Sequence, residues 1–280
     1  MDYVIDHDLH LHSGLSLCSL DPEQTPQRLL QYAIENGYRQ ICLTDHFYDE
    51  RAPHPAYAGS GYDKQNSAYI CRSLPLPQDD RVQFLFGGET DMDMYDHIGI
   101  SEAFLQQLDF LIIPINHLHV RDFTIDSRLI TPVNWKIPGT EESCRILSVL
   151  WVRRLRAVLE ADLPFGKVGL AHLQWFNFAD ERYMAHTLDL IPDVMLRELF
   201  CRVAELGAGV ELNFIDRAMT PQVSASVYRI FETAKACGCK FYFGSDAHHP
   251  AELAGAKANF TAIAARLGLT EADKFHIAGV

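Results

Sequence analysis

The stretch Asp6-His7-Asp8-Leu9-His10-Leu11-His12-Ser13, close to the start of the 280-residue sequence, decides how the rest of the chain is interpreted. Polar and apolar residues alternate through it, which is typical of a β-strand with a side-chain period of two. The alternation predicts that Asp8, His10 and His12 share one face, with Leu9 and Leu11 on the other. Two imidazoles side by side predict a metal site, because neutral imidazole is a common ligand for zinc and iron.

Short apolar segments alternate with helical patterns along the whole chain, and no linker separates them. We expect strands over residues 4–11, 39–44, 82–86, 110–115, 167–171, 209–212 and 240–243. We expect helices over residues 28–35, 62–72, 101–108, 141–161, 193–206, 221–236 and 250–267. Strands that alternate with helices predict an α/β fold with a parallel sheet, and we expect residues 1–280 to form a single domain.

Each predicted strand carries, or is followed by, a residue that can bind a metal. These residues are His10, His12, Asp45, His46, Glu89, His117, His172, Glu211, Asp246 and His248. A closed barrel brings the carboxyl ends of its strands to one mouth, so we expect these side chains to share a pocket. An open doubly wound sheet is the alternative, but it would carry a glycine-rich phosphate loop near its first strand. Two or three divalent cations would offset the clustered carboxylates.

Composition and charge limit the classes of partner that this chain is expected to bind. Its formal net charge of −13 disfavours long nucleic acids and anionic membranes, both of which attract basic surfaces. The seven cysteines are scattered, which predicts reduced thiols and a cytoplasmic protein, and we interpret the close pair Cys237 and Cys239 as structural or incidental. We expect neither a secretory leader nor a membrane span, and the sequence leaves the oligomeric state open.

Four motifs together resemble the PHP family, named after polymerase and histidinol phosphatase domains. They are His10-Leu11-His12-Ser13, Thr44-Asp45-His46, Gly88-Glu89 and Gly244-Ser245-Asp246-Ala247-His248, with His117 and His172 between them. The resemblance covers nearly the whole chain and implies a distorted (β/α)7 barrel, similar to a TIM barrel, with two or three metal ions at the strand ends. It implies the ligands His10, His12, His46, Glu89, His117, His172, Asp246 and His248. Glu89 and Asp246 would bridge metals, and zinc, iron and manganese all suit these donors.

One ligand position departs from the family pattern. Members usually supply another histidine or aspartate shortly after the first motif, where this chain has Cys18 and Asp21. Cys18 aligns with a histidine of some phosphatase members, whereas Asp21 offers a harder oxygen donor. Both residues stay open as ligands, and a third metal depends on this position.

The resemblance implies a metal-dependent phosphoesterase that hydrolyses a small-molecule phosphomonoester with a metal-activated water. Histidinol phosphate is the leading substrate, because small stand-alone members of the family include histidinol phosphatases. We expect Asp246, His248 and Glu89 to take part in catalysis, and Asp45 to orient a neighbouring ligand. The residues expected to contact the substrate are His119, Arg121, Glu211, Asn213 and Arg217. Trp135, Trp151 and Trp175 are expected to be packing residues.

Three other interpretations stay open. A phosphodiesterase or exonuclease acting on nucleotides or short single-stranded nucleic acid would use a similar centre, although the acidic charge argues against long nucleic acid. The second alternative is a regulatory module that binds metal but catalyses no reaction, and the nearly complete ligand set argues against it. An amidohydrolase barrel also begins with His-x-His, but it would need a metal-bridging lysine on a middle strand and an aspartate on an eighth strand.

Overall fold

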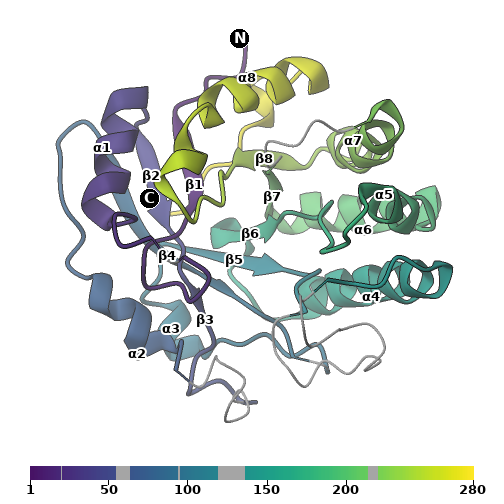
Figure 1. Ribbon diagram of the computed structural model, residues 1–280, viewed down its shortest axis with the longest axis horizontal. Coiled ribbons are helices and arrows are strands. Elements are labelled where there is room, and N and C mark those ends of the chain that lie inside the picture. Colours follow the sequence, from purple (N-terminus) through teal and green to yellow (C-terminus); the bar gives the residue numbers. More distant parts are fainter. Residues whose placement is uncertain (20, 55–63, 94, 119–135, 214–219) are drawn as a thin grey trace.

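The computed structural model describes residues 1–280 except 20, 55–63, 94, 119–135 and 214–219 (Figure 1). A parallel sheet of eight described strands forms its centre, in the order β1-β2-β4-β5-β6-β7-β8, with β3 paired to β4. The strands are β1 His7–Leu11, β2 Gln40–Leu43, β3 His46–Phe47, β4 Gln83–Thr90, β5 Phe110–Pro114, β6 Val168–Ala171, β7 Gly209–Leu212 and β8 Lys240–Phe243. The sheet curls until β8 lies beside β1, which confirms the predicted α/β barrel.

The helices pack on the outer side of this sheet (Figure 1). The α-helices are α1 Pro26–Asn36, α2 Ser67–Ile70, α3 Glu102–Leu105, α4 Glu141–Glu160, α5 Glu181–Asp189, α6 Asp193–Leu206, α7 Pro221–Ala236 and α8 Ala256–Leu267. Short 3-10 helices cover Cys71–Ser73, Phe165–Lys167, Pro250–Leu253 and Glu271–Asp273. None of the described helices is long and apolar enough to span a membrane.

Helix α4 shows why the helices lie where they do. Leu147, Trp151, Leu155 and Val158 recur at helical spacing and are fully buried, so they form one apolar stripe that faces the sheet. Burying side chains of this size contributes about 1.5–3 kcal/mol each. At the start of α4 the hydroxyl of Thr140 accepts a hydrogen bond from the Ser143 amide, which caps the helix.

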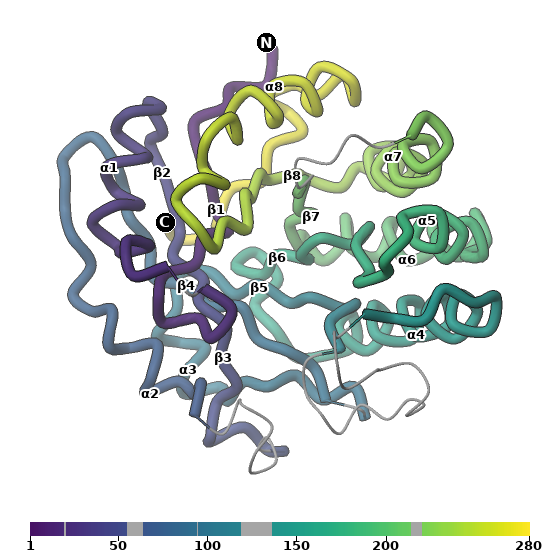
Figure 2. Tube along the Cα trace, in the orientation of Figure 1, coloured from purple at the N-terminus to yellow at the C-terminus, as the bar shows by residue number. Residues whose placement is uncertain are grey.

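Hydrogen bonds between β1 and the segment that follows β8 close the barrel. The amide of His12 donates to the carbonyl of Ala247 over 3.2 Å, and the amide of Asp246 donates to the carbonyl of His10 over 2.8 Å. The segment that follows β8 accordingly runs beside β1 (Figure 2). Closure therefore places two residues of the first motif next to those of the last motif.

The first strand departs from its predicted alternation. The register of β1 against β2 shifts between Asp8 and Leu11, and such an irregularity redirects the side chains that follow it. Leu9 packs inside the barrel, whereas Leu11 packs with the outer core. The prediction that Asp8 shares the face of His10 and His12 is wrong, because the Asp8 carboxylate accepts hydrogen bonds from the Ser245 amide and the Tyr32 hydroxyl.

We call the carboxyl ends of the strands the top of the barrel. Below them, the barrel interior is filled by an apolar cluster, which we call the apolar plug. It consists of Leu9, Cys42, Leu85, Phe110, Ile112, Ala171, Tyr242, Phe275 and Ile277. Phe275 belongs to the C-terminal segment, and its amide donates to the carbonyl of Phe241 over 2.8 Å. A β-carbon at Gly169 would lie 2.5 Å from the Phe110 ring, so the plug packs directly against the backbone of β6.

Three elements differ from the sequence predictions. Helix α5 was not predicted, and the two-residue strand β3 extends the path of β2 beyond the predicted segment. The helix predicted over residues 250–267 is divided into a 3-10 turn and α8. The division falls at Gly255, whose φ of 83° belongs to the left-handed region that favours glycine and is incompatible with a continuous helix.

Candidate metal centre

Six imidazoles and two carboxylates meet above the apolar plug, at the carboxyl ends of the strands. They are His10, His12, His46, Glu89, His117, His172, Asp246 and His248. His10, His46 and Glu89 lie on β1, β3 and β4, and the others follow β1, β5, β6 and β8. His10, His12 and Glu89 are completely shielded from solvent, and Asp246 and His248 reach the surface. The barrel thus concentrates ionisable groups from distant parts of the sequence in one buried place.

Four donor atoms form the centre of this group. The Nε2 atoms of His10 and His12 are 3.0 Å apart. Glu89 Oε2 lies 3.1 Å and 3.3 Å from them, and Asp246 Oδ1 lies 3.4 Å and 3.0 Å from them. Ligands about 2.1 Å from a common ion lie about 3.0–3.4 Å from one another in octahedral or tetrahedral shells. The four atoms therefore have the mutual spacing of a metal's ligand shell.

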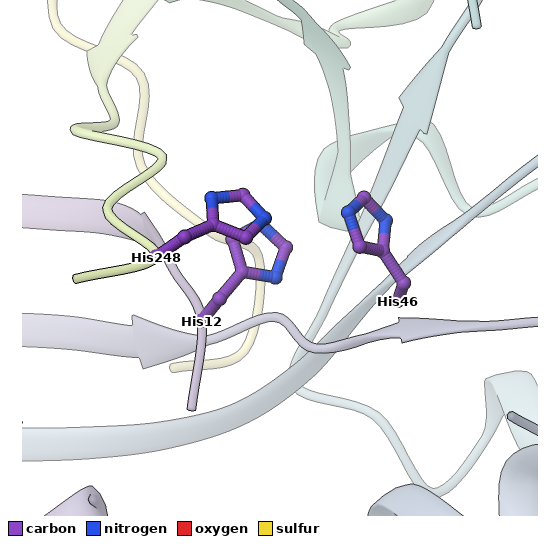
Figure 3. Close-up of side chains that lie close together, drawn as sticks. All are labelled: His12, His46 and His248. Carbon is purple, nitrogen blue, oxygen red and sulfur yellow. The ribbon is translucent and has the colours of Figure 1, made fainter. Parts of the chain in front are cut away.

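Two further donor groups overlap with the central four. His12, His46 and His248 form one, and His46, Glu89 and His117 form the other, with all donor atoms of a group within 4.8 Å of one another. The rings of His12 and His248 stack with centroids 4.0 Å apart, and His46 stands beside them (Figure 3). Glu89 belongs to two of the three groups, so it is the carboxylate that these two groups share.

Hydrogen bonds behind the cluster aim the donor atoms at it. Glu211 Oε1 lies 2.6 Å from His10 Nδ1, so this nitrogen carries the proton and Nε2 presents a lone pair. His12 Nδ1 lies 3.0 Å from the hydroxyl of Ser16, which itself donates to Asp45 over 2.8 Å. Asp45 therefore orients His12 through Ser16, in the supporting role predicted for it.

Similar partners orient the histidines that follow β5 and β6. Asp91 Oδ1 lies 2.9 Å from His117 Nδ1, and Asn116 Oδ1 lies 3.2 Å from His172 Nδ1. The opposite nitrogen of His172 then faces Glu89 over 3.0 Å. Sequence analysis did not identify Asp91 or Asn116, although each stands two residues or fewer from a residue that it did identify.

Glu211 does not occupy the place predicted for a substrate contact. It is fully buried, its Oε1 pairs with His10, and its Oε2 accepts the backbone amide of His172 over 2.6 Å. A side chain at Gly244 would collide with both Glu211 and His10, so this packing requires glycine. Both carboxylate oxygens are used inside the protein, and we correct the role of Glu211 from binding substrate to orienting His10.

The charges of the centre depend strongly on one another. Burial opposes ionisation of Glu89 and Asp246, but the surrounding imidazoles, His10 foremost for Asp246 and His46 for Glu89, hold the pKa of both carboxyls well below the usual range. Burial opposes protonation of His10 and His46, yet nearby carboxylates raise the pKa of both imidazoles well above the usual value. Protons on the imidazoles and divalent cations are alternative ways to balance these carboxylates.

A cavity of about 540 Å³ opens beside the donors, a size typical of small-molecule sites. Trp175 and Phe260 supply its aromatic walls, and Asn213 and Asn259 supply amides. Trp175 was predicted to be a packing residue, but it is only partly buried, and its ring stands edge-on to His117 with centroids 6.3 Å apart. Asn213, predicted to contact substrate, lines the cavity, and its amide donates to Asp246 Oδ2 over 3.3 Å.

The structure places Cys18 and Asp21, the two alternative ligands of the first loop, in different surroundings. Cys18 lines the cavity, and its thiol is in hydrogen-bonding contact with His46 and His248. Desolvation disfavours the thiolate, but these two histidines lower the pKa of Cys18 to about 5. Asp21 instead forms an ion pair with His249 over 2.7 Å and belongs to none of the donor groups found among the described residues.

Three predicted substrate contacts, His119, Arg121 and Arg217, lie outside the described residues. The structure adds Arg154 on α4, which sequence analysis missed and which is completely buried. Its guanidinium donates to the carbonyl of His117 over 2.6 Å and reaches the carbonyl of Met92, so it ties the segment after β4 to the segment after β5. The sequence feature that could have revealed Arg154 is its position between Trp151 and Val158, on a helix face that is otherwise apolar.

The protein is a parallel α/β barrel with a buried cluster of imidazoles and carboxylates at the carboxyl ends of its strands. No protein-family model matches this chain, and no curated protein matches it. Among solved structures, it is similar to histidinol phosphate phosphatase from Lactococcus lactis subsp. lactis, in complex with zinc, L-histidinol and phosphate. The TM-score is 0.58 at 16% identity, over 97% of this chain and 98% of that one, which shows a shared fold.

Proposed function

We propose that this chain is a metal-dependent phosphoesterase of the PHP type that hydrolyses a small-molecule phosphomonoester. The observation that carries the proposal is the shell of four donor atoms from His10, His12, Glu89 and Asp246, which lies beside a cavity of about 540 Å³. The likeness to a phosphatase in complex with zinc and phosphate supports the same conclusion. A structural stack of histidines would not need two buried carboxylates directed at the same point.

The donor groups indicate which residues would hold the ions. His10, His12, Glu89 and Asp246 would hold one ion, and His46, Glu89 and His117 would hold a second, which leaves His248 of the third group able to carry a proton. His172 faces Glu89 and Cys18 faces His46 and His248, which makes both additional donors. Divalent ions held there supply a nucleophile from water at neutral pH and neutralise the oxygens of a bound phosphate. Imidazole, carboxylate and thiolate together favour zinc over magnesium or calcium.

The chain's own groups would handle the proton and the leaving group. His248 stands at the cavity, and its Nδ1 lies 2.8 Å from the carbonyl of Asp246, which leaves Nε2 as the nitrogen that exchanges protons. Burial opposes protonation, but Cys18 and Asp246 raise the pKa of His248 to about 9, so it can hold a proton for the departing alkoxide. Asn213 would keep Asp246 oriented toward the cluster.

The residues that line the cavity indicate which substrates would fit it. The rings of Trp175 and Phe260 and the small side chains of Ala251 and Ala254 suit a compact leaving group, and the Asn259 amide offers it one polar contact. A histidinol-phosphate-like ester combines a flat ring with polar groups and is our leading substrate. Nucleotides are larger and place a second charged or sugar unit against the same walls.

A substrate panel with defined metals tests this proposal. Purified protein loaded with zinc, manganese or iron is assayed for phosphate release from histidinol phosphate, other phosphomonoesters, a mononucleotide, a dinucleotide and single-stranded DNA. We expect release from small phosphomonoesters, and loss of it in His248→Gln but not in His276→Gln, which changes an exposed histidine outside the cluster. Cleavage of dinucleotide or DNA alone would favour a phosphodiesterase, and bound metal without any turnover would favour a regulatory module.

Cobalt spectroscopy tests the proposed role of Cys18. Cobalt(II) bound to a thiolate gives an intense charge-transfer band in the near ultraviolet, which nitrogen and oxygen ligands do not give. We expect this band in the cobalt-loaded protein, its disappearance in Cys18→Ser, and its persistence in Cys71→Ser, which removes a thiol away from the cavity. A cobalt-loaded chain that binds metal but lacks the band would contradict Cys18 as a ligand and leave the other donors unaffected.

A further inference from the structure

Two cysteines outside the metal centre lie side by side in the helical layer. Cys201 is on α6 and Cys237 caps the end of α7, and their sulfur atoms are 3.1 Å apart although 36 positions separate them in the sequence. Cys239, the apparent sequence partner of Cys237, points elsewhere, and its thiol donates to the carbonyl of Phe200 over 3.2 Å. The close pair in space is therefore Cys201 with Cys237, not Cys237 with Cys239.

Solvent access and the pKa of Cys237 bear on how the two thiols react. Both are partly exposed, so a small reagent can reach them from solvent. Burial and the neighbouring Cys201 raise the pKa of Cys237 to about 11, which keeps this residue a thiol at neutral pH. The thiolate is the nucleophile in disulfide exchange, so the raised pKa disfavours Cys237 as the first attacker.

We propose that Cys201 and Cys237 form an oxidisable dithiol that low-molecular-weight disulfides, such as oxidised glutathione, convert into an intramolecular disulfide. The Cys201 sulfur attacks one sulfur of the small disulfide, forms a mixed disulfide and releases one small thiolate. The Cys237 sulfur then attacks Cys201 in the mixed disulfide and releases the second. Two protein thiols are oxidised, the small disulfide is reduced to two thiols, and the two protons pass to those thiols.

The geometry favours the second step over a persistent adduct. A disulfide needs the two sulfurs about 2.05 Å apart, so they have to approach by only about 1 Å. The cross-link would join α6 to α7 and enclose β7, the strand that carries Glu211. Such a link restricts the unfolded chain and stabilises the segment behind the donor cluster. The proposal does not depend on the reaction that the metal centre performs.

Peptide mapping after equilibration with glutathione tests the proposal. The full chain is incubated at graded ratios of oxidised to reduced glutathione, its remaining thiols are blocked, and its peptides are analysed by mass spectrometry. We expect a Cys201–Cys237 peptide in the wild type, in Cys239→Ser and in Cys18→Ser, and its loss in Cys237→Ser. We expect the oxidised wild type to unfold about 5–10 °C higher than the reduced form, and to return to the lower value with dithiothreitol.

Two different results of the peptide mapping would overturn the proposal. A glutathione adduct that stays on Cys201 without cross-linking would show that Cys237 does not complete the exchange. A Cys237–Cys239 link would show that the sequence neighbours, not the spatial neighbours, react. The wild-type peptide map decides between these results even where a substituted chain folds poorly.

Discussion

The interior of the barrel has two layers that follow opposite physical rules. The apolar plug fills the lower layer with side chains such as Leu85 and Phe110, and the donor cluster fills the upper layer. Some strands supply both layers: Leu9 belongs to the plug, and His10, the next residue, belongs to the cluster. The register shift in β1 makes this possible, because two adjacent residues both point inward.

The difference between the layers separates stability from function. The plug stabilises the fold by removing apolar surface from water, at about 25 cal/mol per Å². The donor layer buries carboxylates, which is unfavourable unless cations or protons compensate the charge. A barrel that needed only stability would fill this layer with apolar side chains as well. Substitutions in the two layers should therefore affect different measurements, and four experiments test this contrast.

The largest effect is expected for Glu89→Gln, because Glu89 faces two donor groups at once. Removing one partner from a buried charge network typically costs about 3–5 kcal/mol. We therefore expect metal affinity to fall roughly 100- to 5,000-fold and phosphate release to fall with it. Zinc titration and elemental analysis measure the change, with the exposed Glu232→Gln on α7 as the matched control. Unchanged zinc binding would remove Glu89 from the ligand set.

The counterpart in the lower layer is Leu85→Ala. Leu85 is 4% exposed, and truncating a buried leucine lowers the free energy of unfolding by about 2–5 kcal/mol. We expect this loss in denaturant unfolding while zinc content per folded chain stays the same. Val149→Ala, which shortens an exposed side chain on α4, should change stability little. If Leu85→Ala weakened zinc binding as much as it weakened folding, the two layers would not be energetically separate.

Zinc should stabilise the protein more as the pH rises. The raised pKa values of His10, His46 and His248, the last to about 9, mean that folding favours their protonated forms when no cation competes. For His248 that contribution is fully present below the unfolded value of about 6.5 and is lost as the pH rises through about 9, and for His10 and His46 it is likewise lost as the pH rises through their raised pKa values. Zinc ligands are deprotonated, so zinc does not depend on this contribution.

Thermal unfolding with zinc and with a chelator at pH 6.5, 7.5 and 8.5 measures this effect. The zinc concentration is fixed at about 100 times the dissociation constant measured at pH 6.5, where it stabilises by about 2.7 kcal/mol, and we expect the difference in midpoint to widen with pH because zinc then binds more tightly. A difference that stayed constant or narrowed would show that protons and zinc do not compete for the same imidazoles.

The smallest effect is expected for Glu211→Gln, which alters the support behind His10 and leaves the donor atoms in place. Loss of such an orienting partner typically reduces metal affinity or activity about 10- to 100-fold. Zinc titration together with kcat and KM identifies the role. Weaker zinc binding supports the orienting role, whereas a raised KM with unchanged zinc binding would restore Glu211 as a substrate contact.

Much of this arrangement was accessible from local sequence patterns. Apolar segments such as Phe110–Pro114 alternate with amphipathic helices such as α4, and this order of local preferences specifies parallel strands joined by helices. Parallel strands bring their carboxyl ends together, so residues as distant as His10 and Asp246 could be predicted to meet. The predicted barrel is confirmed, and the donors that were to gather at its mouth do lie together.

Local patterns specify the order of strands and helices and the kinds of side chain at the strand ends, because both follow from neighbours within a few residues. Three further features arise only when distant segments pack together: Glu211 supports His10, Arg154 ties two rim segments together, and Cys201 meets Cys237. This packing also turned Asp8 away from the cluster through a register shift. These outcomes depend on contacts between residues far apart in the chain, whose distances no local pattern encodes.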